Sequence, residues 1–180
     1  PSSFAGNPLL VSTETLKSWG LIDETVELAE STHVDFDAVA AAKLPMIAAA
    51  ADAFATKASV SLKAELENFR NHPANFWLAD YALFVALKSA HQDAAWFQWP
   101  KPLATRDAKA IANAAKQHAA QIERTTIEQF FFAKQWQLLR DHANANGIRL
   151  LGDCPFYVAH DSAEVWAAPE LFDLNTDGTC

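Results

Sequence analysis

The sequence predicts an α/β fold in which a long, mainly helical region leads into a strand of a parallel barrel. Alanine-rich and amphipathic segments dominate the chain up to about residue 147. A short apolar run, 148–151, follows the longest of them directly, and a helix leading into a buried strand is half of a β-α-β unit. The run ends on Gly152 and Asp153. Barrels of this class present their functional side chains at the carboxyl ends of their strands.

Composition limits the classes of partner. The chain has 180 residues, 51% of them hydrophobic, which is enough for a sizeable core. Its 14 basic and 22 acidic residues give a net charge of −8, and Lys and Arg are scattered singly. Such a chain repels phosphate backbones, so we expect no nucleic-acid partner. Charges interrupt the apolar stretches well before the ~20 residues of a membrane span, so we expect no membrane partner either.

The ends and the cysteines suggest a fragment from a reducing compartment. The chain begins at Pro1 without Met, stops at Cys180 just after an Asp-Gly pair, and opens with no signal-peptide pattern. We therefore expect a piece of a longer protein. Cys154 and Cys180 are its two cysteines, and they lack a Cys-x-x-Cys or other metal-ligand spacing. The expected location is the cytoplasm.

Local signals predict five helices ahead of the strand. Apolar spacing and alanine content place them, in chain order, at 12–19, 45–69, 76–89, 107–123 and 125–144. Ser12 or Thr13 can cap the first helix, and Gly20 follows it where a left-handed residue is favoured. The sequence is alanine-rich and helix-prone from Asp35 to Asn71, and Pro45 suits the first turn of a helix that runs towards Phe69. Two prolines are expected to keep 96–102 out of helix.

The last predicted helix carries two apolar stripes and should be buried on several sides. Gly147 is expected to end it. The chain then divides into three predicted parts. These are a barrel-proximal loop at 1–11, a mainly helical subdomain at 12–123, and a barrel segment at 124–180. The last part comprises the long helix, the strand ending at Asp153 and the loop that follows on the active-site side.

Asp153 is the leading candidate for an active-site carboxylate. The competing interpretation is a turn or helix cap, a role that short acidic residues often take. We favour the site, because Pro155 fixes the next turn and Phe156 and Tyr157 follow. Aromatic rings beside a carboxylate suit sugars, whose C–H faces stack on rings while their hydroxyls bind carboxylates. Trp96 and Trp99 could also stack on a saccharide, although core packing is the more common fate of such residues.

Other groupings of polar residues are interpreted structurally. His160, Asp161 and Ser162 have the residue types of a hydrolase triad, but adjacent residues do not converge on one atom, so Asp161 or Ser162 is expected to cap a helix. The segment 173–178 matches the first half of a calcium loop, and an Asp-Gly turn is the favoured interpretation. The histidines show no paired metal spacing. Asp80 is either a buried polar anchor or a helix-surface residue.

The segment 152–166 resembles the signature segment of the 4-α-glucanotransferases, also called amylomaltases or disproportionating enzymes, glycoside hydrolase family 77. Further stretches resemble the family in the same order along the chain, at 4–10, 77–84, 135–136, 169–172 and 177–178. Cys154 stands where the family usually has a larger aliphatic residue, and Ala168 where Asn is frequent. Neither departure removes a group expected to be catalytic.

The resemblance implies a cytoplasmic enzyme with a (β/α)8 TIM barrel. This chain would be a partial barrel with a large, mainly helical inserted subdomain, and predominantly α. The implied reaction cuts an α-1,4-glucosidic bond and passes the glucan segment to the 4-hydroxyl of an acceptor, by a retaining double displacement. The implied partners are maltooligosaccharides, amylose-type α-1,4-glucans and glucose as acceptor, with no metal or organic cofactor.

The resemblance also implies that no catalytic residue lies in this chain. The family's nucleophile and acid/base come after residue 180, whereas Asp153, at the end of the third barrel strand, and Tyr157 support the glucan site. The isolated chain is therefore expected to be inactive and to fold poorly, because open strand edges remain. The alternative is a non-catalytic glucan-binding or helical interaction module. It rests on the helix-rich first part and on the absence of the catalytic carboxylates.

Overall fold

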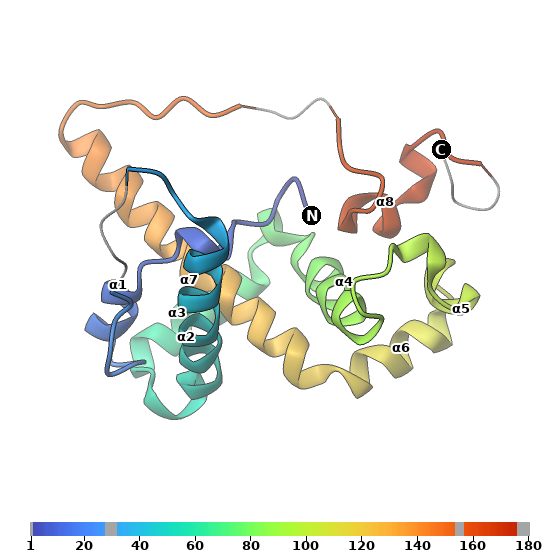
Figure 1. Ribbon diagram of the computed structural model, residues 1–180, viewed down its shortest axis with the longest axis horizontal. Helices are drawn as coiled ribbons and strands as arrows, with labels where there is room; N and C mark the ends of the chain where they lie inside the picture. The colour runs from blue at the N-terminus through green and yellow to red at the C-terminus, as the bar shows by residue number, and fades with distance from the viewer. Residues whose placement is uncertain (1, 28–31, 154–156, 176–180) are drawn as a thin grey trace. The chain divides into compact units, whose positions relative to one another are not determined.

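The computed structural model describes residues 2–27, 32–153 and 157–175, and in these ranges the regular structure is entirely helical (Figure 1). The chain forms two compact units that alternate along the sequence. Unit 1 comprises Pro1–Ala5, Pro73–Thr126 and Gly152–Cys180, and unit 2 comprises Gly6–His72 and Ile127–Leu151. The predominance of helix agrees with the sequence. The three-part division of the chain stays a prediction.

Unit 2 is built from α1 (Thr13–Ser18), α2 (Phe36–Lys57), α3 (Val60–Asn71) and the greater part of the long helix α7 (Ala119–Ala145). A 3-10 turn at Pro8–Leu10 precedes α1. Its core contains rings from α2 and α7: Phe54 lies 6.0 Å from Phe130 and 5.9 Å from Phe131, between ring centroids. The other buried aliphatic side chains of this core are Val11, Leu16, Leu21, Ile22, Ile47, Leu62, Leu66 and Ile127.

Three helix ends in unit 2 lie where neighbouring residues predicted them. The Ser12 hydroxyl accepts a hydrogen bond from the Thr15 N–H at 3.1 Å and caps α1. Gly20 has a φ of +74° just after α1, and Gly147 has a φ of +73° just after α7. Both are left-handed positions that a glycine takes without a steric cost. These predicted ends are confirmed.

The predicted helix 45–69 is wrong, because two helices take its place. The Asp35 carboxylate accepts from the Ala38 N–H at 3.0 Å, and this cap starts α2 well ahead of Pro45, which therefore lies inside the helix. A second cap, from the Leu62 N–H to the Ser59 hydroxyl at 3.1 Å, starts α3. Two side-chain caps thus outweighed the preference of proline for a first turn.

Unit 1 contains α4 (Leu78–Ala90), α5 (Lys101–Ala104), α6 (Ala108–Gln117) and α8 (Ala163–Ala167). Three 3-10 turns, at Pro73–Asn75, Trp96–Gln98 and Pro169–Leu171, complete it. Its core is aromatic: Trp166 lies 5.8 Å from Phe84 and 5.7 Å from Trp99, between ring centroids. Other buried members are Leu83, Leu87, Trp96, Ala114, Ala163 and Val165.

Two predicted boundaries in this part are wrong. The segment 96–102 was expected outside helix, but Pro102 lies in the first turn of α5, where a missing N–H costs no hydrogen bond. The helices predicted at 107–123 and 125–144 instead divide at His118. The Asp107 carboxylate caps α6 by accepting from the N–H groups of Lys109 and Ala110.

The predicted strand at 148–152 is absent. Residues 148–153 have neither helix nor strand assignment, and no strand occurs among the described residues. Leu151 is 100% exposed, and Ile148 and Leu150 are 56% and 46% exposed. A strand needs a neighbour for its N–H and C=O groups and a facing layer for its apolar side chains. The described part of the chain supplies neither to this segment, and the barrel itself is not seen.

By length and composition, α2 could cross a membrane, contrary to the expectation from charge spacing. Among the described residues it is the one helix long and apolar enough, and 22% of its most apolar 18-residue stretch is buried. Ile47, Ala50, Ala51 and Phe54 of α2 belong to the core of unit 2. One such helix is weak evidence for a span, since core helices pass the same test.

Candidate functional site

The two predicted site residues, Asp153 and Tyr157, lie in the connection between α7 and α8. Neither belongs to a helix or a strand, and both are exposed, Tyr157 to 93%. The residues between them, including Cys154, Pro155 and Phe156, lie outside the described residues. An exposed carboxylate and an exposed phenol can each bond a ligand hydroxyl. Their role in a glucan site stays a prediction.

A partly buried ammonium group fixes the chain that follows Tyr157. Lys88, at the end of α4, donates to the Asp161 Oδ2 at 2.6 Å and to the carbonyls of Asp93 and Ala94 at 2.8 and 3.2 Å. These partners match the three donors of an ammonium group. The other carboxylate oxygen of Asp161 accepts the Trp96 N–H at 3.1 Å. We call these groups the Lys88 clamp, since they join Asp161 to the end of α4 and to Trp96.

The three adjacent residues 160–162 have separate partners within the described structure. The Ser162 hydroxyl accepts from the Val165 N–H at 3.4 Å and caps α8. The His160 ring stacks on Phe97, with centroids 4.5 Å apart and planes 8° apart. Asp161 is held by the clamp. Of the two predicted cap residues, Asp161 and Ser162, it is Ser162 that supplies the cap.

Asp80 matches neither alternative fully, because its side chain is 40% exposed and yet forms an ion pair. Its Oδ1 accepts from the Arg106 Nη2 at 2.5 Å, and the Arg106 guanidinium lies 4.2 Å from the centroid of the Trp166 ring. The Trp166 indole N–H donates to the Leu103 carbonyl at 3.0 Å. Trp166 is 1% exposed. Helix α8, just downstream of the candidate segment, is therefore held by α4 and by the α5–α6 connection.

Unit 1 has a cavity of about 770 Å³ between the 96–105 region and the 169–175 region, which we call the aromatic cavity. Its aromatic lining comprises Trp96, Phe97, Trp99 and Phe172, and its polar lining Lys101, Thr105, Glu170 and Asn175. Trp96 and Trp99 are each 4% exposed, so the expectation of core packing is confirmed for both. Volumes between about 300 and 1,000 Å³ are typical of small-ligand sites.

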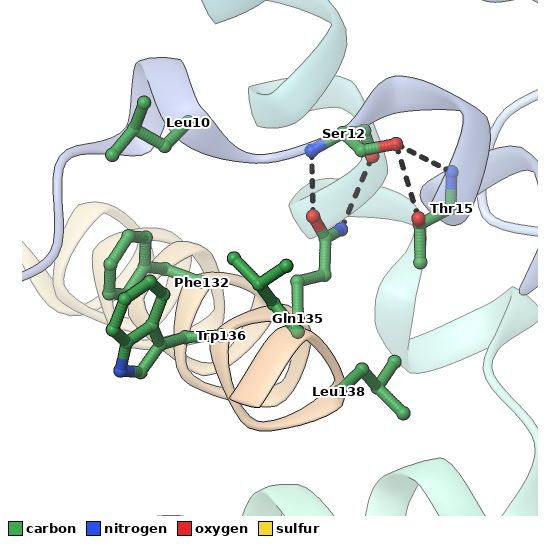
Figure 2. A pocket seen from close by; sticks show the side chains of 8 residues that line it. Leu10, Ser12, Thr15, Phe132, Gln135, Trp136 and Leu138 are labelled. Atoms are coloured by element: carbon green, nitrogen blue, oxygen red, sulfur yellow. Dashed lines mark hydrogen bonds between the residues drawn. The ribbon is translucent and has the colours of Figure 1, made fainter. Parts of the chain in front are cut away.

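Unit 2 has a more apolar cavity of about 490 Å³ along α7 and the segment before α1 (Figure 2). Figure 2 shows the rings of Phe132 and Trp136 side by side, and their centroids lie 6.4 Å apart. The Gln135 amide brackets Ser12: its oxygen accepts the Ser12 N–H at 2.7 Å, and its nitrogen donates to the Ser12 carbonyl at 3.2 Å. The amide is thus occupied by protein and leaves the apolar walls to define this cavity.

A second glutamine of α7 makes the same bracket. Gln129 accepts from the Gly6 N–H at 2.8 Å and donates to the Gly6 carbonyl at 3.0 Å. A Cβ atom on Gly6 would lie 2.0 Å from the Phe132 ring. The position therefore has no room for a side chain. Neither bracket was predicted, although a glutamine within an apolar helical stretch is a usable signal of a buried polar contact.

The described residues contain no group of three or more His, Cys, Asp or Glu side chains that could hold a metal ion. Asp177 and Gly178 of the partial calcium-loop pattern lie outside those residues. In unit 2, backbone and Ser12 hydrogen bonds hold the pKa of Glu14 below its ordinary value. Burial lowers the pKa of Lys43, whose ammonium donates to the Leu9 carbonyl at 2.6 Å.

Comparison with known proteins assigns the chain to a family. The family described as 4-alpha-glucanotransferase matches residues 1–180. The chain is 40% identical to the 4-alpha-glucanotransferase of Thermus thermophilus over 98% of this chain and 35% of that protein. It is 36% identical to the chloroplastic/amyloplastic 4-alpha-glucanotransferase of Solanum tuberosum over 96% of this chain and 30% of that protein.

A solved structure agrees with these relatives. The amylomaltase from Streptococcus agalactiae in complex with acarbose superposes with a TM-score of 0.88 at 30% identity, over 98% of this chain and 36% of that one. The chain thus spans about a third of the length of the relatives it matches. The match in order along its whole length shows that this chain belongs to the 4-alpha-glucanotransferase family.

Proposed function

We propose that the protein containing this chain transfers a segment of a 1,4-α-glucan to the 4-hydroxyl of an acceptor glucan or glucose. The observation that carries the proposal is the family match over residues 1–180. The donors would be maltooligosaccharides and amylose-type glucans, and the place of action the cytoplasm. The relative from Streptococcus agalactiae binds acarbose, which supports a saccharide ligand. A non-catalytic module is less well supported, since the relatives named above are transferases or amylomaltases.

The proposed mechanism is a retaining double displacement, in which one carboxylate attacks the anomeric carbon and a carboxylic acid protonates the leaving oxygen. Residues outside 1–180 would supply these two groups. Asp153 and Tyr157 would bind sugar hydroxyls beside them. The Lys88 clamp supports this role, because it holds the chain only a few residues downstream of Tyr157.

The exposed apolar residues at 148–151 support a barrel in the longer protein. Ile148, Leu150 and Leu151 have large exposed fractions, and a third strand of a (β/α)8 barrel would cover them with neighbouring strands. Asp153 would then lie at the carboxyl end of that strand. The same argument explains why the chain alone should fold poorly and lack activity.

The test is the disproportionation of maltotriose by the protein expressed from its full reading frame. We expect glucose and longer maltooligosaccharides, detected by chromatography, and no products from the 180-residue chain alone. Asp153→Asn removes the charge while keeping the size of the side chain, and should lower the transfer rate without lowering the thermal stability. A folded full-length protein that forms no longer oligosaccharide would overturn the proposal.

A further inference from the structure

One carboxylate ties the start of the chain to helix α8. The Oε1 atom of Glu164, in the first turn of α8, accepts from the Ser2 hydroxyl and, at 3.0 Å, from the Ser3 N–H. The Ser2 hydroxyl oxygen in turn accepts the N–H groups of Phe4 and Ala5, each at 3.1 Å. A hydroxyl has one proton to donate, and here that proton goes to Glu164.

The serine turn, as we call residues 2–5, also contacts the start of α4. The Phe4 ring is stacked on Trp77, with centroids 6.3 Å apart and planes 14° apart, and it meets Phe76 edge-on at 5.3 Å. The other end of α4 carries the Lys88 clamp, which holds the residues just before α8. These contacts form a closed circuit within unit 1, and the Glu164 carboxylate is the link that joins the serine turn to α8.

The second oxygen of the Glu164 carboxylate is buried without a partner. Its Oε2 atom is shut off from solvent and accepts no hydrogen bond from any described residue. Burying a carboxylate oxygen in this way costs free energy, and a residue kept only for stability has no need to carry that cost. Departures of this kind are expected where a side chain serves function. The unpaired oxygen therefore favours a role for Glu164 beyond stability.

From these contacts we infer that Glu164 is a positioning residue for the saccharide site of the full-length protein. It fixes the serine turn, which belongs to the predicted barrel-proximal loop, against the segment that carries Tyr157. It acts through Ser2 and Ser3 and does not itself contact the sugar. The saccharide and its reaction rest on the proposed function, whereas the tie between Glu164 and the serine turn does not depend on it.

The experiment compares single variants of the full-reading-frame protein. Glu164→Ala removes the acceptor, and Ser2→Ala removes the hydroxyl that donates to it. Glu164→Gln is the conservative variant, because its amide oxygen can still accept from both donors. Asp173→Ala is the matched control, since it removes an exposed carboxylate of unit 1 outside this circuit.

Amide hydrogen exchange followed by mass spectrometry reports the tie itself. We expect Glu164→Ala to speed exchange in the serine turn about tenfold or more. The Ser3 N–H loses its acceptor directly, and Ser2 loses the partner that orients its hydroxyl towards the N–H groups of Phe4 and Ala5. Glu164→Gln and Asp173→Ala should exchange at close to the parent's rate.

Kinetics with maltotriose and calorimetry with acarbose, the ligand of the Streptococcus agalactiae relative, report the site. Glu164→Ala and Ser2→Ala should each raise the KM for maltotriose and the Kd for acarbose about fivefold or more, with kcat changed less than about twofold. The double variant should be no weaker than Glu164→Ala, because both changes break one interaction. Glu164→Gln should restore KM and Kd to within about twofold of the parent, and Asp173→Ala should leave them unchanged.

The outcomes separate this inference from the proposed function. A residue that only stabilises the fold lowers the melting temperature without changing KM or Kd well below it. Transfer with KM and Kd at the parent's values in Glu164→Ala, or exchange at the parent's rate, therefore overturns the inference and leaves the transferase standing. Weakened acarbose binding in a protein without transfer supports the inference and overturns the proposed function. Absence of both transfer and acarbose binding overturns both.

Discussion

Replacing Lys88 with Met should destabilise unit 1 by about 2–3 kcal/mol. The Lys88 side chain is 16% exposed and that of Asp161 is 32% exposed, so the pair is partly buried. Loss of one partner of a fully buried pair costs about 3–5 kcal/mol, and partial exposure reduces that cost. The change also leaves the Asp93 carbonyl without this donor. That carbonyl belongs to a turn in which Gln92 and Asp93 have φ values of +54° and +60°, conformations that are costly without support.

The assay is thermal unfolding of the full-reading-frame protein together with amide exchange at Trp96, whose N–H donates to Asp161. A loss of 2–3 kcal/mol lowers the melting temperature by roughly 2–3 °C in a protein about three times as long as this chain. Lys57→Met is the matched control, because its pair with Asp23 is 42% and 90% exposed and should contribute less than about 1 kcal/mol. If Lys88→Met unfolds like the control and Trp96 exchanges at the parent's rate, the clamp does not hold this segment.

Three further changes test other features of the fold. Gly6→Ala should destabilise unit 2 by about 1–3 kcal/mol in urea unfolding, because the new Cβ would overlap the Phe132 ring. Gly152→Ala is the control, since a Cβ there meets no atom within 4 Å. Equal stabilities of the two variants would refute the close packing at Gly6. Gln92→Gly should stabilise unit 1 by about 0.5–1 kcal/mol, since φ is +54° there, and a lower urea midpoint would contradict this. The lowered pKa of Glu14 stabilises the fold above its ordinary value of 4.5, and this contribution is lost as the pH falls. Glu14→Gln should therefore flatten the acid limb of stability against pH, and an unchanged limb would count against this assignment.

Short-range signals explain which parts of the fold were predictable. The Ser12 cap, the left-handed glycines 20 and 147, and the core of the predicted helix 76–89 depend on residues within about one turn of each other. The predicted start of α2 was wrong because both Asp35 and Pro45 are residues at which a helix can begin. Helix propensity does not decide between them. The predicted strand at 148–152 was wrong because a strand forms only by pairing with a neighbouring strand. No such neighbour occurs among the described residues.

The candidate site was also only partly predictable, because local signals do not reveal contacts between residues distant in sequence. Asp153 and Tyr157 could be named from the motif alone, but the contacts that position their surroundings join residues distant in sequence. Lys88 and Asp161 are separated by 73 positions, and Gly6 and Gln129 by 123. No periodicity or local spacing encodes such pairs. The aromatic cavity was likewise out of reach, because the sequence marks Trp96 and Trp99 without showing that the 169–175 segment faces them.

The central claim is glucan transfer by the protein that contains this chain. Its most direct test is incubation of the full-reading-frame protein with unlabelled maltotriose and isotope-labelled glucose. We predict that the label moves into maltose and longer maltooligosaccharides, with the α configuration of the new bond, as a retaining transfer requires. Maltotriose that stays intact, or label that stays in glucose while maltotriose is hydrolysed, would contradict the account.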